Sequence, residues 1–538
     1  MLSYRSVAAF TAGALLAGAA ATATPAAAAG PPGRPAVQVA GLGVTDLRAL
    51  LTQRKTTSVQ LVREYLRRID AYDGPRGERP GLSAVINVNG RALGEAARLD
   101  AERRAGRVRG PLHGVPVVVK DNFDTADMPT TSGSAALREL RPPDDSEQIR
   151  RLRQAGAIVL AKTNMHEYAM NIYTISSLGG QTRNPYDPSR HPGGSSGGTG
   201  AAVAASYAPV GLGSDTCGSI RIPAAHNNLV GLRPTMGLSS RDGIAPLSGT
   251  QDVGGPIGMS VRDVALVLEA TAGYDPDDQV TKASIGRVPR DYEKTLRKSA
   301  LKGKRIGVFT DYFATATSDE QATAALVRAA IADMTGLGAR AVELGPQPEI
   351  MTAAAGANRV RDEFERDLNA YLASSARGRP AHLAALEPPY DQLTLADIAT
   401  SGEVTPSVLS TLRAWVNSPA LPNPSYTEKL RQRDVLRQGL TDLMKAHRLD
   451  AVVYPTIGSP PTKIGTTQSY LNCRLAGYSG FPALSVPAGF TAGGLPVGVE
   501  LLGLPFSEPA LLGMGHAYEQ ATRHRTPPAG TPALPAAG

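Results

Sequence analysis

Cysteine and aromatic residues are scarce in this sequence. Only two of its 538 residues are cysteines, Cys217 and Cys473, which excludes a small scaffold held together by disulfides.

Aromatic residues make up 5% of the chain, and the net charge of +8 arises from basic and acidic residues spread along the chain without a dense basic block. Nucleic-acid-binding proteins cluster lysine and arginine beside stacking aromatics, so no nucleic-acid partner is expected. With 42% hydrophobic residues, the chain is long enough to bury a large core.

Long apolar runs are missing beyond the N-terminus. No residue between Arg5 and Arg34 is charged, and the most apolar part, residues 7–21, has the length of the central region of a signal peptide. It is shorter than the roughly 20 apolar residues that a membrane span needs. Alanines at 27–29 match an A-x-A cleavage pattern. We therefore expect residues 1–29 to be a signal peptide, the mature protein to be secreted, and no membrane span to be present. A retained anchor or a disordered tail is the alternative.

Export changes the interpretation of the two cysteines, because thiols outside the cytosol tend to pair. Cys217 and Cys473 could form one disulfide that closes a long loop. The alternative is that both are buried, inert thiols. The sequence leaves this choice open.

Helical and strand patterns alternate along the chain, which is typical of an α/β protein. Thr57 to Gln60 form a capping-box pattern, and apolar residues at helical spacing follow it. The apolar run 115–119 predicts a buried strand that ends at Lys120 and a loop. The periodicity also predicts helices at 92–104, 147–154 and 201–205 and strands at 157–161, 209–213, 450–455 and 483–487.

Two further regions have a distinctive composition. Residues 275–424 are rich in Ala, Arg, Glu and Leu, which predicts an inserted helical region that shapes the substrate pocket. The Pro- and Ala-rich tail after Thr526 is expected to be mobile.

The glycine-rich stretch 192–199 has no regular periodicity and is expected to be a loop. It is neither a phosphate-binding loop, because no Gly-Lys-Ser/Thr follows, nor a dinucleotide-binding motif, because the glycine spacing differs. Residues 193–197 match G-x-S-x-G, the nucleophile elbow of α/β-hydrolases, with Ser195 at its centre. That fold also needs a catalytic histidine, and none of the histidines lies in a motif that singles it out. An esterase that uses Ser195 therefore remains an alternative.

Several longer motifs point elsewhere. A second serine, Ser219, follows in Gly218-Ser219-Ile220-Arg221-Ile222-Pro223, and Lys120 precedes both serines in Lys120-Asp121-Asn122. Further motifs lie at 161–165, 213–223, 231–235, 481–489 and 494–498. With these motifs in this order, the chain resembles the amidase signature hydrolases over most of the mature sequence. The resemblance implies a single domain over residues 30–538 with an α/β fold, in which helices sandwich a large mixed β-sheet.

Carried over to this sequence, the resemblance makes Ser219 the nucleophile, Ser195 a bridging serine on a cis peptide, and Lys120 the base. It also implies that the backbone N–H groups of Thr216, Cys217, Gly218 and Ser219 form the oxyanion hole. Many relatives have glycine at the position of Cys217. A serine hydroxyl needs a nearby base, and a lysine can be that base only when burial or a positive neighbour lowers its pKa. We therefore expect Lys120 to be buried.

The resemblance implies an enzyme that hydrolyses carboxamides through an acyl-enzyme, without a cofactor. Peptide amides or small aliphatic or aryl amides are the expected substrates, and the leaving group, ammonia or an amine, is open, as is the oligomeric state. A cysteine nucleophile at Cys217 would need an activating histidine motif, which is missing, and the scattered histidines have no zinc-binding spacing. A secreted binding protein without catalysis is the second alternative, although Lys120, Ser195 and Ser219 are all present.

Overall fold

The computed structural model describes residues 37–74, 81–375, 393–469 and 471–535, which belong to one compact unit, Ala36–Gly538. The predicted signal peptide, residues 1–29, lies outside the described residues. In the described part of the chain, no helix combines the length and the apolar character needed to cross a bilayer.

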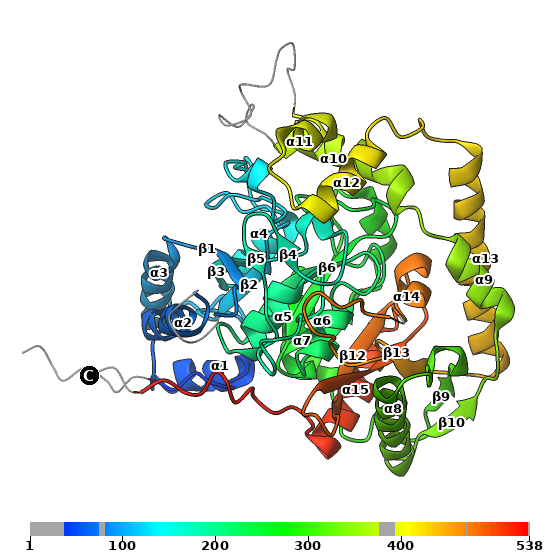
Figure 1. Ribbon diagram of the computed structural model, residues 1–538. Helices are drawn as coiled ribbons and strands as arrows, with labels where there is room; N and C mark the ends of the chain where they lie inside the picture. The colour runs from blue at the N-terminus through cyan, green and yellow to red at the C-terminus, as the bar shows by residue number, and fades with distance from the viewer. Residues whose placement is uncertain (1–36, 75–80, 376–392, 470, 536–538) are drawn as a thin grey trace, which may run out of the picture. The chain divides into compact units, whose positions relative to one another are not determined.

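One large mixed sheet runs through the described residues (Figure 1). Its strands follow the order β1 (Val85–Val88), β3 (Ile158–Thr163), β2 (Pro116–Lys120), β6 (Val210–Asp215), β8 (Val253–Gly258), β7 (Val230–Arg233), β12 (Ala483–Phe490), β13 (Pro496–Leu502), β11 (Ala451–Pro455), β9 (Arg305–Val308) and β10 (Arg340–Glu343). Strand β2 is parallel to β3 and β6, the middle strands are antiparallel, and β9 is parallel to β10 and β11. A separate pair consists of β4 (Ile175–Ser176) and β5 (Gly180–Gln181).

The helices are α1 (Val44–Thr52), α2 (Ser58–Tyr72), α3 (Ala92–Arg104), α4 (Glu147–Gln154), α5 (Gly197–Ala204), α6 (Arg221–His226), α7 (Val261–Thr271), α8 (Ser318–Gly336), α9 (Pro348–Gly356), α10 (Val360–Ser375), α11 (Leu395–Ser401), α12 (Pro406–Trp415), α13 (Pro424–Ala446), α14 (Arg474–Ser479) and α15 (Glu508–Thr522). Short 3₁₀ turns lie at Ala135–Leu137, Glu167–Ala169, Gln279–Ser284, Glu293–Thr295 and Thr310–Tyr312.

Helices cover both faces of the sheet. A Cβ atom at Gly211 of β6 would meet Thr199 of α5, whereas the neighbouring residue, Val210, lies with Val264 of α7 beside Gly258. Successive residues of a strand point to opposite faces, so α5 and α7 pack on opposite sides. The predicted fold class, an α/β protein with a large mixed sheet sandwiched by helices, is therefore confirmed.

Local signals predicted several elements correctly. Thr57 caps α2 by accepting a hydrogen bond from the backbone N–H of Gln60, with an N···O distance of 3.2 Å. Strand β2 is fully buried and ends at Lys120, and α4 spans the eight residues that the periodicity predicted. Each of these signals lies within a single helix or strand, so it can be recognised from the sequence without the tertiary structure.

The predicted loop 192–199 differs from the structure at its end, because α5 already begins at Gly197. Glycine is a poor helix former, but here it permits close packing: a Cβ atom at Gly198 would lie 2.2 Å from the carbonyl oxygen of Asn164. Tertiary packing therefore overrides the local preference.

Residues 275–424 and the C-terminal tail also differ from expectation. The predicted helical region contains α8 to α12, but it also contributes β9 and β10 to one edge of the main sheet. The tail after Thr526 is held, because buried Arg68 donates hydrogen bonds of 2.8 Å to the carbonyl oxygens of Thr531 and Pro532. Periodicity did not reveal these long-range contacts.

Candidate active site

The candidate base lies at the carboxyl end of a central strand. Strands β2 and β6 run in parallel, with Val119 opposite Leu212, and end at Lys120 and Asp215. The carboxyl ends of parallel strands meet at one edge of a sheet, where α/β proteins commonly bind ligands. Ser214, near the end of β6, is thereby brought beside Lys120.

Lys120 has no exposed surface. Its Nζ atom lies 2.7 Å from Ser195 Oγ and 2.8 Å from Ser214 Oγ. Burial lowers the pKa of Lys120 from 10.5 to about 7, although the charges of Asp252 and Asp215 act in the opposite direction. A substantial fraction of the amine is therefore neutral near pH 7, as a base requires.

The loops that carry the two candidate serines touch each other. The backbone N–H of Ser196 donates a hydrogen bond to the carbonyl oxygen of Ser219, with an N···O distance of 3.2 Å. The peptide bond between Gly194 and Ser195 is cis. Ser195 is fully buried, whereas Ser219 is 5% exposed and lines a cavity. A substrate in this cavity would meet Ser219 first, with Lys120 and Ser195 behind it.

No histidine ring bonds to Ser195 Oγ within the ranges that the structure describes. His166 approaches through its backbone, donating an N–H···O hydrogen bond of 3.0 Å to the carbonyl oxygen of Ser195. A nucleophile elbow needs an imidazole at the serine hydroxyl, so this arrangement argues against the esterase alternative.

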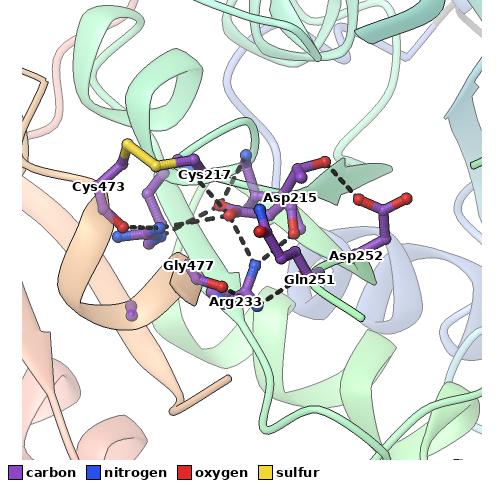
Figure 2. Close-up of polar contacts among 12 residues, drawn as sticks. Asp215, Cys217, Arg233, Gln251, Asp252, Cys473 and Gly477 are labelled. Carbon is purple, nitrogen blue, oxygen red and sulfur yellow. Dashed lines mark hydrogen bonds and ion pairs between the residues drawn. A yellow bond between two sulfur atoms is a disulfide. The ribbon is translucent and has the colours of Figure 1, made fainter. Parts of the chain in front are cut away.

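Asp215 organises the backbone on both sides of Ser219. Its carboxylate accepts hydrogen bonds from the backbone N–H groups of Gly218 and Ile220, at 2.8 and 3.1 Å. It also pairs with two buried arginines, Arg221 and Arg233; Figure 2 shows the pair with Arg233. Burial would raise the pKa of Asp215, but these two positive charges hold it well below its ordinary value. The loop that carries Ser219 is therefore fixed to a charged group that stays ionised.

Cys217 and Cys473 form a disulfide, with Cα atoms 5.0 Å apart (Figure 2). The bond ties the loop that carries Ser219 to the start of α14. Of the two possibilities that the sequence left open, the structure has the disulfide rather than free thiols. A disulfide-bonded sulfur cannot act as a thiolate nucleophile, which removes the cysteine alternative.

The four predicted oxyanion-hole donors lie together in the turn before α6. The N–H of Gly218 is already donated to Asp215. The N–H groups of Thr216, Cys217 and Ser219 have no hydrogen-bond acceptor among the described residues. These three groups are therefore free to bind an oxyanion, and their role stays a prediction.

The cavity in front of Ser219 has a volume of about 720 Å³. Its apolar walls include Met170, Ile172, Leu247, Tyr312 and Trp415, which come from distant parts of the chain. Residues of α9, α10 and α14 complete it, namely Met351, Val360, Arg361, Arg474 and Tyr478. Much of the wall therefore belongs to the region 275–424, which the sequence predicted to shape the pocket. Among the described residues, no cluster of His, Cys, Asp and Glu could hold a metal ion.

The chain is similar to known proteins in both sequence and fold. The sequence model of the amidase family matches residues 60–512. The chain belongs to the amidase signature family. It is thus a hydrolase acting on C–N amide bonds, as the motifs predicted.

Individual members of the family resemble this chain over most of its length. The crystal structure of native peptide amidase from Stenotrophomonas maltophilia superposes with a TM-score of 0.79 at 40% identity, covering 90% of this chain and 98% of that one. A glutamyl-tRNA(Gln) amidotransferase subunit of a Synechococcus strain is 35% identical over 513 residues, 91% of this chain and 94% of that protein. A probable amidase of Arabidopsis thaliana is 34% identical over 499 residues, 90% and 91% of the two chains.

Sequence reasoning about this amidase missed three residues around Lys120, Ser195 and Ser219. Ser214 accepts a hydrogen bond from Lys120, and Asn122 Nδ2 lies 3.1 Å from Ser214 Oγ. Asp252 accepts a hydrogen bond from the hydroxyl of Thr216. Ser214 and Asn122 lie within motifs that carry the resemblance, but only the fold shows which atoms they contact. Asp252 had no local signal.

Proposed function

We propose that this chain is a secreted amidase in which Ser219 forms an acyl-enzyme, Ser195 relays protons and Lys120 is the base. One observation carries the proposal: the fully buried Lys120 lies 2.7 Å from Ser195 Oγ, while Ser219, in the adjoining loop, faces the cavity. An amine in this position provides the proton acceptor that a serine nucleophile needs.

The reaction then proceeds in two halves. Ser219 Oγ attacks the amide carbon while its proton passes to Ser195, whose own proton passes to Lys120. The free N–H groups of the 216–219 turn stabilise the oxyanion. Collapse of this intermediate breaks the C–N bond, and the proton returns through Ser195 to the leaving nitrogen. Water then attacks the ester along the same relay, which releases the acid and restores Ser219.

C-terminally amidated peptides and small aliphatic or aryl amides are the proposed substrates. The cavity wall combines apolar side chains with charged ones, among them Asp311, Arg361 and Arg474, and the volume of about 720 Å³ admits more than a single amino-acid amide. Similarity to the peptide amidase supports the same class. A glutamyl-tRNA substrate, named for the amidotransferase relatives, is disfavoured by the export signal that we propose for residues 1–29.

Secretion is supported by that N-terminal pattern and by the disulfide between Cys217 and Cys473, since disulfides persist in oxidising compartments. Fractionation of a producing culture and N-terminal sequencing test it. A mature chain that begins near Gly30 in the medium is expected, and an intact N-terminus retained inside the cell would refute it.

The catalytic proposal is tested by measuring ammonia release from amidated dipeptides and amine release from the matching anilides. Ser219→Ala, Ser195→Ala and Lys120→Met should each remove nearly all turnover, whereas His524→Gln should retain it. A fluorophosphonate probe should label the wild type but not Ser219→Ala. Full activity of Lys120→Met with loss in a histidine variant would favour the esterase, and a wild type without turnover or labelling would favour the binding protein.

A further inference from the structure

A single side chain outside the proposed triad spans the loop that carries Ser195. The hydroxyl of Thr174 donates a hydrogen bond to the carbonyl oxygen of Gly193, with an O···O distance of 2.7 Å. The same hydroxyl accepts a hydrogen bond from the backbone N–H of Gly197, at 3.1 Å. Gly193 and Gly197 lie on either side of Ser195 in the sequence, so one hydroxyl joins the two arms of the loop.

The backbone of Thr174 is itself held in an unusual conformation. Its φ angle is 53°, in the left-handed region that β-branched residues rarely adopt. Its carbonyl oxygen accepts a hydrogen bond of 3.0 Å from the backbone N–H of Thr182, beside the β4–β5 pair. Thr174 is fully buried. Residues in such conformations persist only where surrounding contacts hold them, and they concentrate at functional sites.

The glycines of the loop lie directly against the same hydroxyl. A Cβ atom at Gly197 would come within 2.2 Å of Thr174 Oγ1, and one at Gly194 within 2.7 Å. Other side chains also hold the loop: the backbone N–H of Gly193 donates a hydrogen bond of 3.1 Å to His191 Nδ1, and Asn227 Nδ2 donates one of 2.6 Å to the carbonyl oxygen of Pro192. The position of the loop is therefore sensitive to the group at Thr174 Oγ1.

We propose that Thr174 is a positioning residue that sets the place of Ser195 Oγ between Lys120 and Ser219, an inference that rests on the proposed function. Ser195 has to stay within hydrogen-bonding distance of Lys120, where it now lies at 2.7 Å, and also exchange a proton with Ser219. A displacement of about 1 Å in such an arrangement lowers the rate roughly 100-fold. Thr174 does not line the cavity, so the effect falls on the chemical step rather than on substrate binding.

The test compares three variants of the full mature chain. Thr174→Val keeps the shape and the β-branch but removes both hydrogen bonds, and Thr174→Ser restores the hydroxyl. Thr271→Val is the matched control, because Thr271 is also a buried threonine whose hydroxyl donates to a backbone carbonyl, that of Val267, in α7. The measurements are kcat and KM on an amidated dipeptide, the rate of labelling by a fluorophosphonate, and the thermal unfolding midpoint.

Thr174→Val should lower kcat by roughly 10- to 100-fold with a KM close to wild type, and should slow labelling in parallel. Thr174→Ser and Thr271→Val should retain wild-type kcat. If Thr174→Val does not fold, Thr174→Ala removes the same hydroxyl without the branched side chain, and the same result is expected.

Two results would overturn the inference in different ways. An active wild type together with a valine or alanine variant that matches Thr271→Val in kcat and labelling refutes the role of Thr174 alone. A wild type with neither amide turnover nor labelling refutes the proposed function, and the inference with it.

Discussion

Replacement of Lys120 by methionine tests the central electrostatic argument, because it removes a buried amine and keeps an unbranched side chain. The shift of the pKa of Lys120 from 10.5 to about 7 means that the folded protein destabilises the protonated amine, relative to the neutral amine, by roughly 5 kcal/mol. The substitution also leaves the hydroxyls of Ser195 and Ser214 without their common partner, which costs about 1–3 kcal/mol for each group. Below about pH 7 these opposing contributions are of similar size, so the informative quantity is how the stability difference between wild type and variant changes as the pH rises.

The sign follows from proton binding. Below pH 7, Lys120 is protonated in both the folded and the unfolded chain, so the stabilities of wild type and Lys120→Met run in parallel. Between pH 7 and pH 10.5 the unfolded chain keeps the proton that the folded chain has lost. Wild-type stability therefore rises relative to the variant, by up to about 1.4 kcal/mol per pH unit.

Denaturant unfolding of both proteins at about pH 7, 8 and 9 measures this difference, and other titrating groups cancel because both chains share them. We expect the wild type to gain roughly 2–3 kcal/mol on the variant over that interval. Wild-type kcat/KM should rise about tenfold per pH unit below about pH 7. Between pH 7 and pH 9 it should level off, because the amine of Lys120 is then mostly neutral. Parallel stability curves would refute the conclusion that Lys120 is neutral in the folded enzyme.

Three other substitutions probe the site. Asp215→Asn should lower the unfolding free energy, measured with denaturant, by about 3–5 kcal/mol, because it leaves two buried arginines without their carboxylate partner. An unchanged unfolding free energy would show that Asp215 does not stabilise these arginines. Joint replacement of Cys217 and Cys473 by serine should remove about 2–5 kcal/mol of stability, and equal unfolding midpoints would argue against the disulfide. Trp415→Ala should raise KM for apolar amides several-fold with little change in kcat, and a loss confined to kcat would show that this side chain does not bind substrate.

Much of the fold followed from local pattern. The capping box of α2 and the apolar strand that ends at Lys120 are signals contained within a few residues, and both are present in the structure. The start of α5 at Gly197 was missed because glycine is a poor helix former, and the close packing that requires glycine, as at Gly198 against Asn164, involves residues far away in the sequence. Strands β9 and β10 were missed because they are four-residue elements within a helical composition.

The sequence by itself determined the family, the three candidate catalytic residues and the alternation of helices and strands, because each is written in contiguous motifs. The tertiary structure alone decided that Cys217 pairs with Cys473, that Thr174 bridges the Ser195 loop, and which hydroxyl groups surround the buried amine of Lys120. Lys120 meets Ser195 and Ser214 across 75 and 94 residues of chain. The loss of water around an amine, and hence its pKa, depends on neighbours that only the folded chain brings together.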